Sequence, residues 1–408
     1  MAPHIQKIGG QIPDSGMPLD IPLNGKNLII TGSNGAGKTW FLKQLNGNLL
    51  SKLMVIDPPL SQLRRELSEL INQGDPGGYS DLHHNHNQKL NYLRQQIEYY
   101  ETHIYLDVDQ ESPITGHQVV MFFEADRKSS IGPASSITSV ETSKAQWRGN
   151  VDQNVVGSAL EQHLANLKSR AAIVARYEKN EAYAQGIDEW FATQELNLKL
   201  LMEDDSTKLV YDPKKDSFTI TREGKRDTTF QSLSSGYSSV FSIYSEILMR
   251  TEVFDISPAE FEAVAFIDEI ETHLHVSLQR LILPFFKNAF PKVQFIVTTH
   301  SPFILTSTTD AVVYDISTNA VIDADLSLFT YAAVMKGIMH TRPTSVILES
   351  IVKNISNIIN TDPIDKSKLR LELNKLHESF ELLDNRAKTF YRLGEKVLAD
   401  SEGDNVQS

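Results

Sequence analysis

The chain has 408 residues, of which 40% are hydrophobic and 22% are charged, as is ordinary for a globular protein of two or three domains. No run approaches the roughly 18 apolar residues of a membrane span, and Met1–Ile5 contains neither a charged nor an apolar stretch, so no span and no secretory signal are predicted. The absence of cysteine excludes disulfides and thiolate zinc sites and fits a cytoplasmic location. The net charge of −13 argues against a wholly basic nucleic-acid binder but allows a local basic patch.

Short strands are expected at residues 4–8 and 19–23, followed by an apolar strand at 27–31. The segment after that strand, Gly32-Ser-Asn-Gly-Ala-Gly-Lys-Thr39, matches the P-loop pattern G-x-x-x-x-G-K-[ST]. Its glycines let main-chain N–H groups curl around a phosphate, and Lys38 adds a positive charge at the terminal phosphates. The Thr39 hydroxyl would coordinate Mg²⁺. The predicted nucleotide-binding residues are Ser33, Asn34, Gly35, Ala36, Gly37, Lys38 and Thr39.

After the P-loop helix, Leu53-Met-Val-Ile56 is expected to be a buried strand. Two later stretches carry apolar residues three and four positions apart and predict amphipathic helices: Leu90, Leu93, Ile97, Tyr100 and Ile104, and then Leu160, Leu164, Leu167, Ala171 and Val174. Each covers only about two heptads, which is too short for a coiled coil.

Val119–Phe123 is expected to be a strand between these helices, followed by a serine-rich mobile loop at 127–143. His83, His84 and His86 invite a metal interpretation, but no carboxylate stands at ligand spacing, so a solvated loop is favoured.

Residues 208–212 and 217–222 alternate in polarity around a turn and predict a β-hairpin. It concentrates basic side chains: Lys208, Lys214, Lys215, Arg222, Lys225 and Arg226. Without an aromatic stacking pattern, a solvated hairpin is favoured over a contact to a phosphate backbone.

Two further apolar strands end in polar residues. Val264–Glu269 has the Walker B arrangement, in which Asp268 would lie in the Mg²⁺ shell and Glu269 would polarise the attacking water. Val293–His300 ends in a histidine whose neighbouring strands would place it beside the γ-phosphate.

Ser234, Ser235 and Gly236 open a predicted helix that runs through Ile243–Leu248. A serine cap followed by exposed N–H groups is an anion-binding helix start. Because the P-loop already holds one set of phosphates, this second start suggests the nucleotide of a partner subunit.

Four motifs occur in the order of an ABC-type ATPase, namely Walker A, signature, Walker B and switch histidine: Gly32–Thr39, Leu233–Tyr237, Phe266–Glu269 and Thr299–His300. The signature resembles L-S-G-G-Q with two departures, Ser235 for the first glycine and Tyr237 for the glutamine.

Two further stretches, Glu271-Thr-His-Leu-His275 and Thr299-His-Ser-Pro-Phe303, resemble soluble ABC-type ATPases related to the SMC and OLD proteins, including the Septu ATPase PtuA. The usual flanking prolines of the first are replaced by Ile270 and Val276. The resemblance covers residues 1–60 and 205–340 and implies a bacterial protein of antiphage defence.

By this resemblance, two copies would sandwich two ATP molecules, each held by one subunit's P-loop and the other's Ser234–Gly236. Glu269 and His300 would be catalytic, and His300 would contact the γ-phosphate; Thr39 and Asp268 would hold Mg²⁺. The family's Q-loop residue is not placed. Gln118 is a weak candidate, and Arg127 could equally serve the site.

The expected fold is α/β: an ABC-type P-loop ATPase core with a mixed sheet (1–60 and 205–340), a largely helical insertion (61–204) and a helical C-terminal region (341–408). In the last region Leu369, Leu373, Leu376, Phe380 and Leu383 recur at helical spacing. It lacks the acidic strand ends of the TOPRIM site found in OLD nucleases, so an effector activity would have to come from a partner.

The hypothesis is therefore an ATP-hydrolysing, Mg²⁺-dependent sensor subunit that gates a partner nuclease or toxin through head-to-tail dimerisation, as a homodimer or higher homo-oligomer in the cytoplasm. The alternatives are a DNA-repair or chromosome-maintenance ATPase that acts on DNA directly, and a non-enzymatic scaffold fixed by bound ATP. The acidic charge and the short helices disfavour the first alternative without excluding contact with nucleic acid, and the intact Asp268–Glu269 pair disfavours the second.

Overall fold

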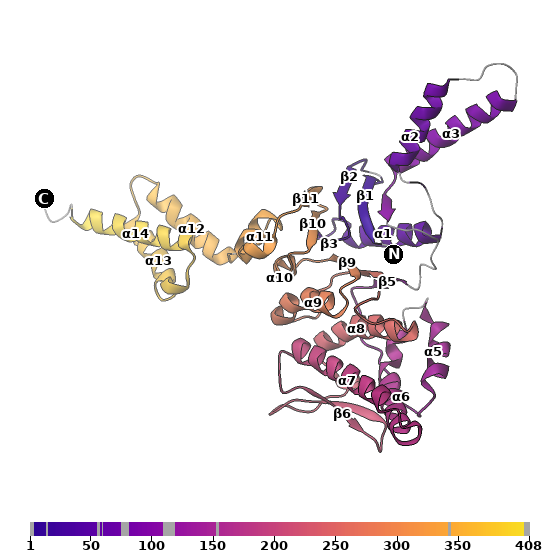
Figure 1. Ribbon diagram of the computed structural model, residues 1–408. Helices are drawn as coiled ribbons and strands as arrows, with labels where there is room; N and C mark the ends of the chain where they lie inside the picture. The colour runs from indigo at the N-terminus through magenta and orange to yellow at the C-terminus, as the bar shows by residue number, and fades with distance from the viewer. Residues whose placement is uncertain are drawn as a thin grey trace. The chain divides into compact units, whose positions relative to one another are not determined.

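The computed structural model (Figure 1) describes residues 4–13, 15–54, 58, 60–74, 81–108, 119–151, 155–341 and 344–403. The chain divides into two compact units between Val334 and Met335. None of the described helices is long and apolar enough to cross a membrane.

A six-stranded sheet in the order β11-β10-β3-β9-β8-β5 forms the centre of the first unit. Its strands are β3 (Asn27–Thr31), β5 (Val120–Phe123), β8 (Ala263–Ile267), β9 (Val293–Thr298), β10 (Ala311–Asp315) and β11 (Ala320–Ile322). All neighbours pair in parallel except β11, which is antiparallel to β10. Every residue of β3, β8 and β9 is buried, as expected of parallel strands covered on both faces. The sheet confirms the predicted mixed α/β fold and the strands at 27–31 and 119–123.

Helices cover both faces of this sheet. Helix α1 (Lys38–Met54) packs Phe41, Leu42 and Leu45 into a core that also contains Ile296 of β9. On the other face, Phe286 of α9 (Val276–Ala289) stacks on Phe295 with ring centroids 5.7 Å apart. The alternation of Phe295 and Ile296 between faces follows the period of a strand.

A smaller antiparallel sheet, in the order β2-β1-β4, extends the same core. It consists of β1 (Ile5–Gln11), β2 (Pro18–Pro22) and β4 (Tyr105–Val108), which confirms the predicted strands at 4–8 and 19–23. The predicted strand at 53–56 is wrong for Leu53 and Met54, which end α1; residues 55 and 56 lie outside the described part. Leu53 continues the four-residue spacing of Leu45 and Leu49, so helical burial of all three outweighs the short apolar run.

Helices α2 (Leu60–Gln73) and α3 (Asp81–Thr102) pack on each other through Leu60, Leu63, Leu93, Ile97 and Tyr100. The first predicted amphipathic helix is thus confirmed. The histidine segment lies within α3 and not in a loop, and His84 Nε2 is 2.8 Å from the Gln88 amide one turn later. Among the described residues no group of three or more histidines and carboxylates is arranged to hold a metal ion.

Helix α5 (Val140–Arg148) packs on α8 (Ser235–Val253) and on α6 (Leu160–Ile173), and α6 packs on α7 (Glu181–Met202). Helix α6 confirms the second predicted helix, and a π-helical turn follows it from Val174 to Glu178. The last four residues of the predicted loop at 127–143 are helical, because α5 begins at Val140. Strands β6 (Lys208–Asp212) and β7 (Ser217–Thr221) confirm the hairpin, where Lys225 pairs with Asp204 at 3.0 Å.

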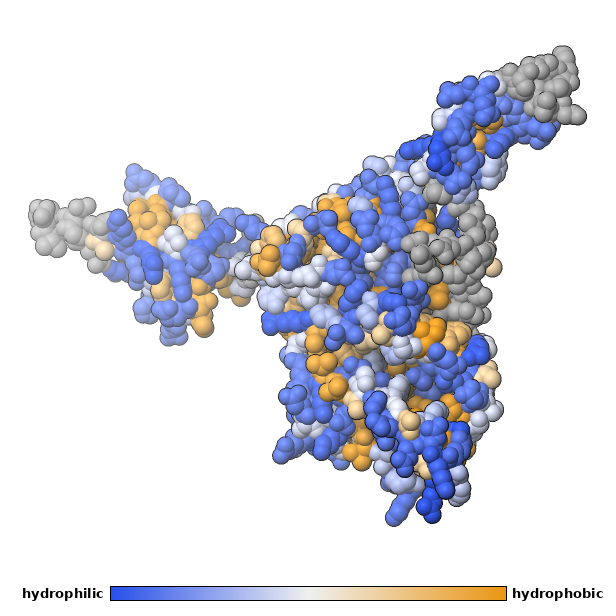
Figure 2. Space-filling model, viewed as in Figure 1, coloured by the Kyte–Doolittle hydropathy of each residue, from blue (hydrophilic) through white to orange (hydrophobic). Residues whose placement is uncertain are grey.

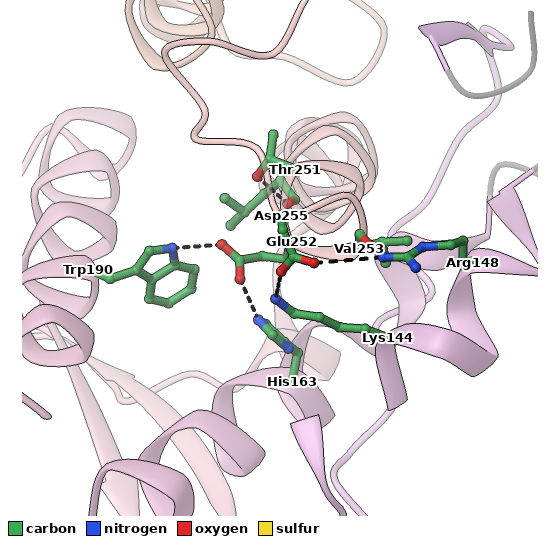
Figure 3. A network of polar contacts seen from close by, with 9 residues as sticks. Lys144, Arg148, His163, Trp190, Thr251, Glu252, Val253 and Asp255 are labelled. Atoms are coloured by element: carbon green, nitrogen blue, oxygen red, sulfur yellow. Dashed lines mark hydrogen bonds and ion pairs between the residues drawn. The ribbon is translucent and has the colours of Figure 1, made fainter. Parts of the chain in front are cut away.

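A polar network attaches these helices to the C-terminal end of α8 (Figure 3). The Glu252 carboxylate accepts hydrogen bonds from His163 Nε2 of α6 at 3.0 Å and from Trp190 Nε1 of α7 at 2.9 Å. Lys144 of α5 donates to Asp255 at 2.5 Å. One carboxylate therefore joins three helices, because His163 and Trp190 bind its two oxygens from different sides.

Glu252→Gln is expected to destabilise the protein by about 1–3 kcal/mol, because it removes charge-assisted hydrogen bonds from a mostly buried site. Burial is the largest single influence on Glu252 and raises its pKa, but the hydrogen bonds from His163 and Trp190 and the charge of Lys144 together outweigh it and hold the pKa below its ordinary value of 4.5. A carboxyl group whose pKa is lower in the folded than in the unfolded state contributes its full stabilisation at a pH above the unfolded-state pKa. That contribution is lost as the pH falls through the folded-state pKa. The difference between wild type and variant should therefore shrink below pH 4.5.

Urea unfolding between neutral pH and pH 4 measures this difference. Glu189→Gln is the matched control, since Glu189 is an exposed residue of α7 that accepts a hydrogen bond from Gln185. Equal unfolding free energies of wild type and Glu252→Gln at pH 7 would contradict the prediction.

The first unit also contains α10 (Pro302–Leu305), and α11 (Tyr331–Gly337) spans the boundary between the units. In the second unit α12 (Val346–Ile359), α13 (Lys366–His377) and α14 (Asn385–Gly403) pack around Ile355, Leu369, Leu373, Leu376 and Tyr391. Phe380 and Leu383 pack against this core, although α13 ends before them and Phe380 begins a 3₁₀ turn. Figure 2 shows hydrophobic areas on this unit, where Val346 and Leu382 are 86% and 90% exposed.

Candidate functional site

Three adjacent strands, β3, β9 and β8, deliver polar residues to one edge of the sheet. The P-loop follows β3, Asp268 and Glu269 follow β8, and His300 comes two residues after β9. Because these strands are parallel and in register, their carboxyl ends meet, which is where open α/β sheets bind ligands.

The P-loop is fastened to the end of β10. Gly32 has φ of +142°, and a Cβ atom there would lie 2.6 Å from Ser317 Oγ. The Ser33 N–H donates to the same hydroxyl at 2.7 Å, and Asp315 accepts the Ser317 N–H at 2.9 Å. Gly32 is therefore required both by its conformation and by the close approach of Ser317. Asp315 and Ser317 were not predicted from the sequence, because they lie almost 300 positions from the loop and carry no motif.

Lys38 is 7% exposed, and its ammonium donates to the carbonyls of Gly32 at 3.1 Å and Ser33 at 2.9 Å. Burial lowers its pKa, and the nearby carboxylates, Glu269 first, partly offset this effect. The cation is thus held within the loop, where the phosphates of a nucleotide would lie.

Asp268 is 3% exposed and receives two hydroxyl groups. Its Oδ2 accepts from Thr39 Oγ1 at 2.8 Å, and its Oδ1 accepts from Thr298 Oγ1 at 2.6 Å. A hydroxyl oxygen and a carboxylate oxygen side by side are ligands that suit Mg²⁺. Thr39 and Asp268 therefore fit the predicted magnesium site.

Glu269 adopts a left-handed backbone conformation, with φ of +41°. Its N–H donates to Thr298 Oγ1 at 2.7 Å, and its side chain accepts a hydrogen bond from Thr272 Oγ1 at 3.2 Å. A non-glycine residue with positive φ is costly and persists where its surroundings enforce it, often at functional sites.

His300 is placed through its main chain by Glu271, whose Oε1 accepts the His300 N–H at 2.5 Å. Burial first, and then the charge of Lys38, lower the pKa of His300 below its ordinary value. The imidazole is therefore neutral at pH 7. Glu271 belongs to the Glu271–His275 motif, but the motif alone did not predict a place for Glu271 in the site.

Residues of the P-loop, Glu269 and His300 line one cleft of about 770 Å³, within the size range of ligand pockets. Its lining residues are Asn34, Gly35, Gly37, Lys38, Thr39, Trp40, Lys43, Glu269 and His300. Trp40 and Lys43 are additions to the predicted set. Trp40 follows the P-loop directly and is 40% exposed. Its position next to the motif is a sequence signal from which a place in the site could have been predicted.

The segment Ser234–Gly236 lies at the start of α8 and does not line this cleft. Ser234 occupies the predicted N-cap position of α8, but its side chain makes no capping hydrogen bond. Ser234 and Ser235 are exposed. Gly236 faces its own chain, because a Cβ atom there would lie 2.9 Å from the His273 carbonyl oxygen.

Of the two Q-loop candidates, Gln118 lies outside the described residues. Arg127 is buried beside the site but does not line the cleft; its guanidinium reaches the carbonyls that follow β8.

A family model described as "AAA domain, putative AbiEii toxin, Type IV TA system" matches residues 145–306. The Retron Vc95 probable ATPase of Vibrio cholerae is 32% identical over 136 residues, which make up 33% of this chain and 26% of that protein. The Septu protein PtuA of Bacillus mycoides is 40% identical over 79 residues, 18% of this chain and 10% of that protein. These matches confirm the predicted resemblance to PtuA-like P-loop ATPases.

The matched segments span 10–26% of the length of these curated relatives. Among solved structures, the SMC head domain from Thermotoga maritima aligns with 79% of this chain and 99% of its own, with a TM-score of 0.35 and 12% identity.

Proposed function

We propose that the chain binds and hydrolyses ATP with Mg²⁺, and that it does so as an ABC-type regulatory subunit of a bacterial antiphage defence complex. The observation that carries this proposal is the single cleft lined by Lys38, Thr39, Glu269 and His300, with Asp268 hydrogen-bonded to Thr39 behind it. The similarity to retron and Septu ATPases supports the biological setting.

In this mechanism the P-loop N–H groups and Lys38 bind the phosphates, and Thr39 and Asp268 hold the metal ion. Bound Mg²⁺ would neutralise charge on the phosphate oxygens. Glu269 orients the attacking water and accepts its proton. His300 donates its ring N–H to the γ-phosphate, and its lowered pKa keeps the imidazole neutral at pH 7.

The assembly completes the proposal. Two chains pair head to tail, so that Ser234, Ser235 and Gly236 of each close on the ATP held by the other. ATP-dependent pairing then holds or releases an effector protein, a nuclease or toxin, in the cytoplasm. The ATPase core is formed by residues 1–60 and 205–340, with 61–204 as the insertion and 341–408 as the C-terminal region; β5 of the insertion joins the core sheet.

Lys38→Ala tests nucleotide binding. We expect Mg-ATP affinity to fall by about 10- to 100-fold, because charge-assisted hydrogen bonds contribute about 1.5–3 kcal/mol. Calorimetry measures the affinity, and the unfolding midpoint verifies the fold. Lys26→Ala is the control, since half-buried Lys26 pairs with Asp323 and does not line the cleft. Unchanged ATP affinity in Lys38→Ala would refute the assignment of the P-loop.

A further inference from the structure

Arg127, four residues after β5, is 7% exposed. Its guanidinium donates to the main-chain carbonyls of the Walker B turn, which we define as Asp268, Glu269 and Ile270. The donor–acceptor distances are 2.7 Å to Asp268, 3.3 Å to Glu269 and 2.9 Å to Ile270. A fourth hydrogen bond, to the Glu124 carbonyl at 3.0 Å, closes the loop that carries Arg127.

The N–H groups of the same turn are bound by the neighbouring strands. The Asp268 N–H donates to the Phe123 carbonyl at 2.9 Å, and the Ile270 N–H donates to the Thr298 carbonyl at 3.1 Å. The Glu269 N–H uses the Thr298 hydroxyl. The strands thus hold one side of the turn, and a single guanidinium holds the other.

This arrangement explains how Glu269 keeps its left-handed conformation. The positive φ of +41° is unfavourable for a residue other than glycine, and in this conformation three successive carbonyls accept hydrogen bonds from one cation. Hydrogen bonds from a charged donor are stronger than those from a neutral donor, and three of them offset that cost. Arg127 remains charged at neutral pH, because burial lowers its pKa only to about 10, with Glu271 and Asp268 opposing the shift.

We propose that Arg127 is a positioning residue for ATP hydrolysis, which fixes the main chain of the Walker B turn and thereby aims the Glu269 carboxylate into the cleft. The inference rests on the proposed ATPase function. A lysine cannot replace Arg127, because a single ammonium lacks the planar fork of donors that spans three carbonyls.

Arg127→Lys separates positioning from binding. We expect the Kd for Mg-ATP to stay within about threefold of wild type, since Arg127 does not touch the P-loop. We expect kcat to fall by about 10- to 100-fold, as when a catalytic group is misplaced by about 1 Å. Arg148→Lys is the matched control, because Arg148 also donates to a main-chain carbonyl, that of Val253 at 2.6 Å, away from the site. A kcat within twofold of wild type, or a loss of affinity that equals the loss of kcat, would overturn the proposal.

A second readout does not depend on hydrolysis. In Arg127→Lys the amides of Asp268–Ile270 should exchange with solvent at least tenfold faster than in wild type, while those of α1 should be unchanged. Unchanged exchange at the turn refutes the positioning role. If the wild type hydrolyses no ATP, the proposed function fails, and the exchange experiment still decides whether Arg127 holds the turn.

Arg127→Ala adds a chemical rescue. Millimolar guanidinium should restore kcat severalfold in this variant and leave Glu269→Gln inactive; an absence of rescue in folded protein counts against the proposal. Loss of cooperative unfolding in both Arg127 variants would also overturn it, by showing that the fold itself requires the residue.

Discussion

Replacing Glu269 with glutamine is expected to leave ATP binding intact and to slow hydrolysis by about 10²-fold or more, as for the loss of a general base. Glutamine has the same shape and can accept the hydrogen bond from Thr272, so the Walker B turn should keep its conformation. The amide cannot take a proton from water. Single-turnover hydrolysis and calorimetry with Mg-ATP separate the two effects.

Glu262→Gln is the matched control, because Glu262 precedes the opposite end of the same strand and pairs with Lys292 at 3.8 Å. It should hydrolyse ATP at the wild-type rate. Equal rates in Glu269→Gln and wild type would remove Glu269 from the mechanism and leave another group to activate the water.

The parts of the fold that the sequence predicted are those whose pattern is local. The P-loop is a contiguous motif, the strand at 27–31 is a short apolar run, and the hairpin at 208–222 alternates in polarity around a turn. Leu53–Ile56 shows the limit of this reasoning. A four-residue apolar run does not distinguish a strand from the last turn of a helix.

The parts of the site that were missed, or were predicted without a role, depend on contacts between distant segments. Ser317 meets Ser33 across 284 positions, and Arg127 meets Asp268 across 141. Nothing around Ser317 marks it, and Arg127 was predicted only as a residue that could serve the site, without a role. The roles of both arise from the order of the strands: β10 lies beside β3, and β5 beside β8. The pairing of non-consecutive strands cannot be predicted from local sequence. The contacts of a buried arginine and a surface serine therefore become evident only in the folded sheet.

The contacts of Gly236 and Ser235 indicate which of them should be substituted to test whether two chains share each nucleotide site. A side chain at Gly236 would collide with the His273 carbonyl of its own chain, so Gly236→Arg would disturb α8 itself. Ser235 is exposed at the first position of the same helix. Ser235→Arg is therefore expected to leave the fold and ATP binding intact and to lower hydrolysis by about 10²-fold, by blocking the approach of α8 to the partner's nucleotide. Ser257→Arg, at an exposed serine before β8, is the control.

Mixing Ser235→Arg with Lys38→Ala subunits tests whether two chains share each site. A mixed dimer has one site built from the intact P-loop of the first variant and the intact signature segment of the second, while its other site carries both lesions. Random pairing makes about half of the dimers mixed, so about a quarter of the wild-type activity should return if the sites act independently. No recovery in dimers that do exchange subunits would mean that both sites must be intact together. Wild-type hydrolysis by Ser235→Arg as a monomer would end the shared-site model, because α8 does not line the cleft of its own chain.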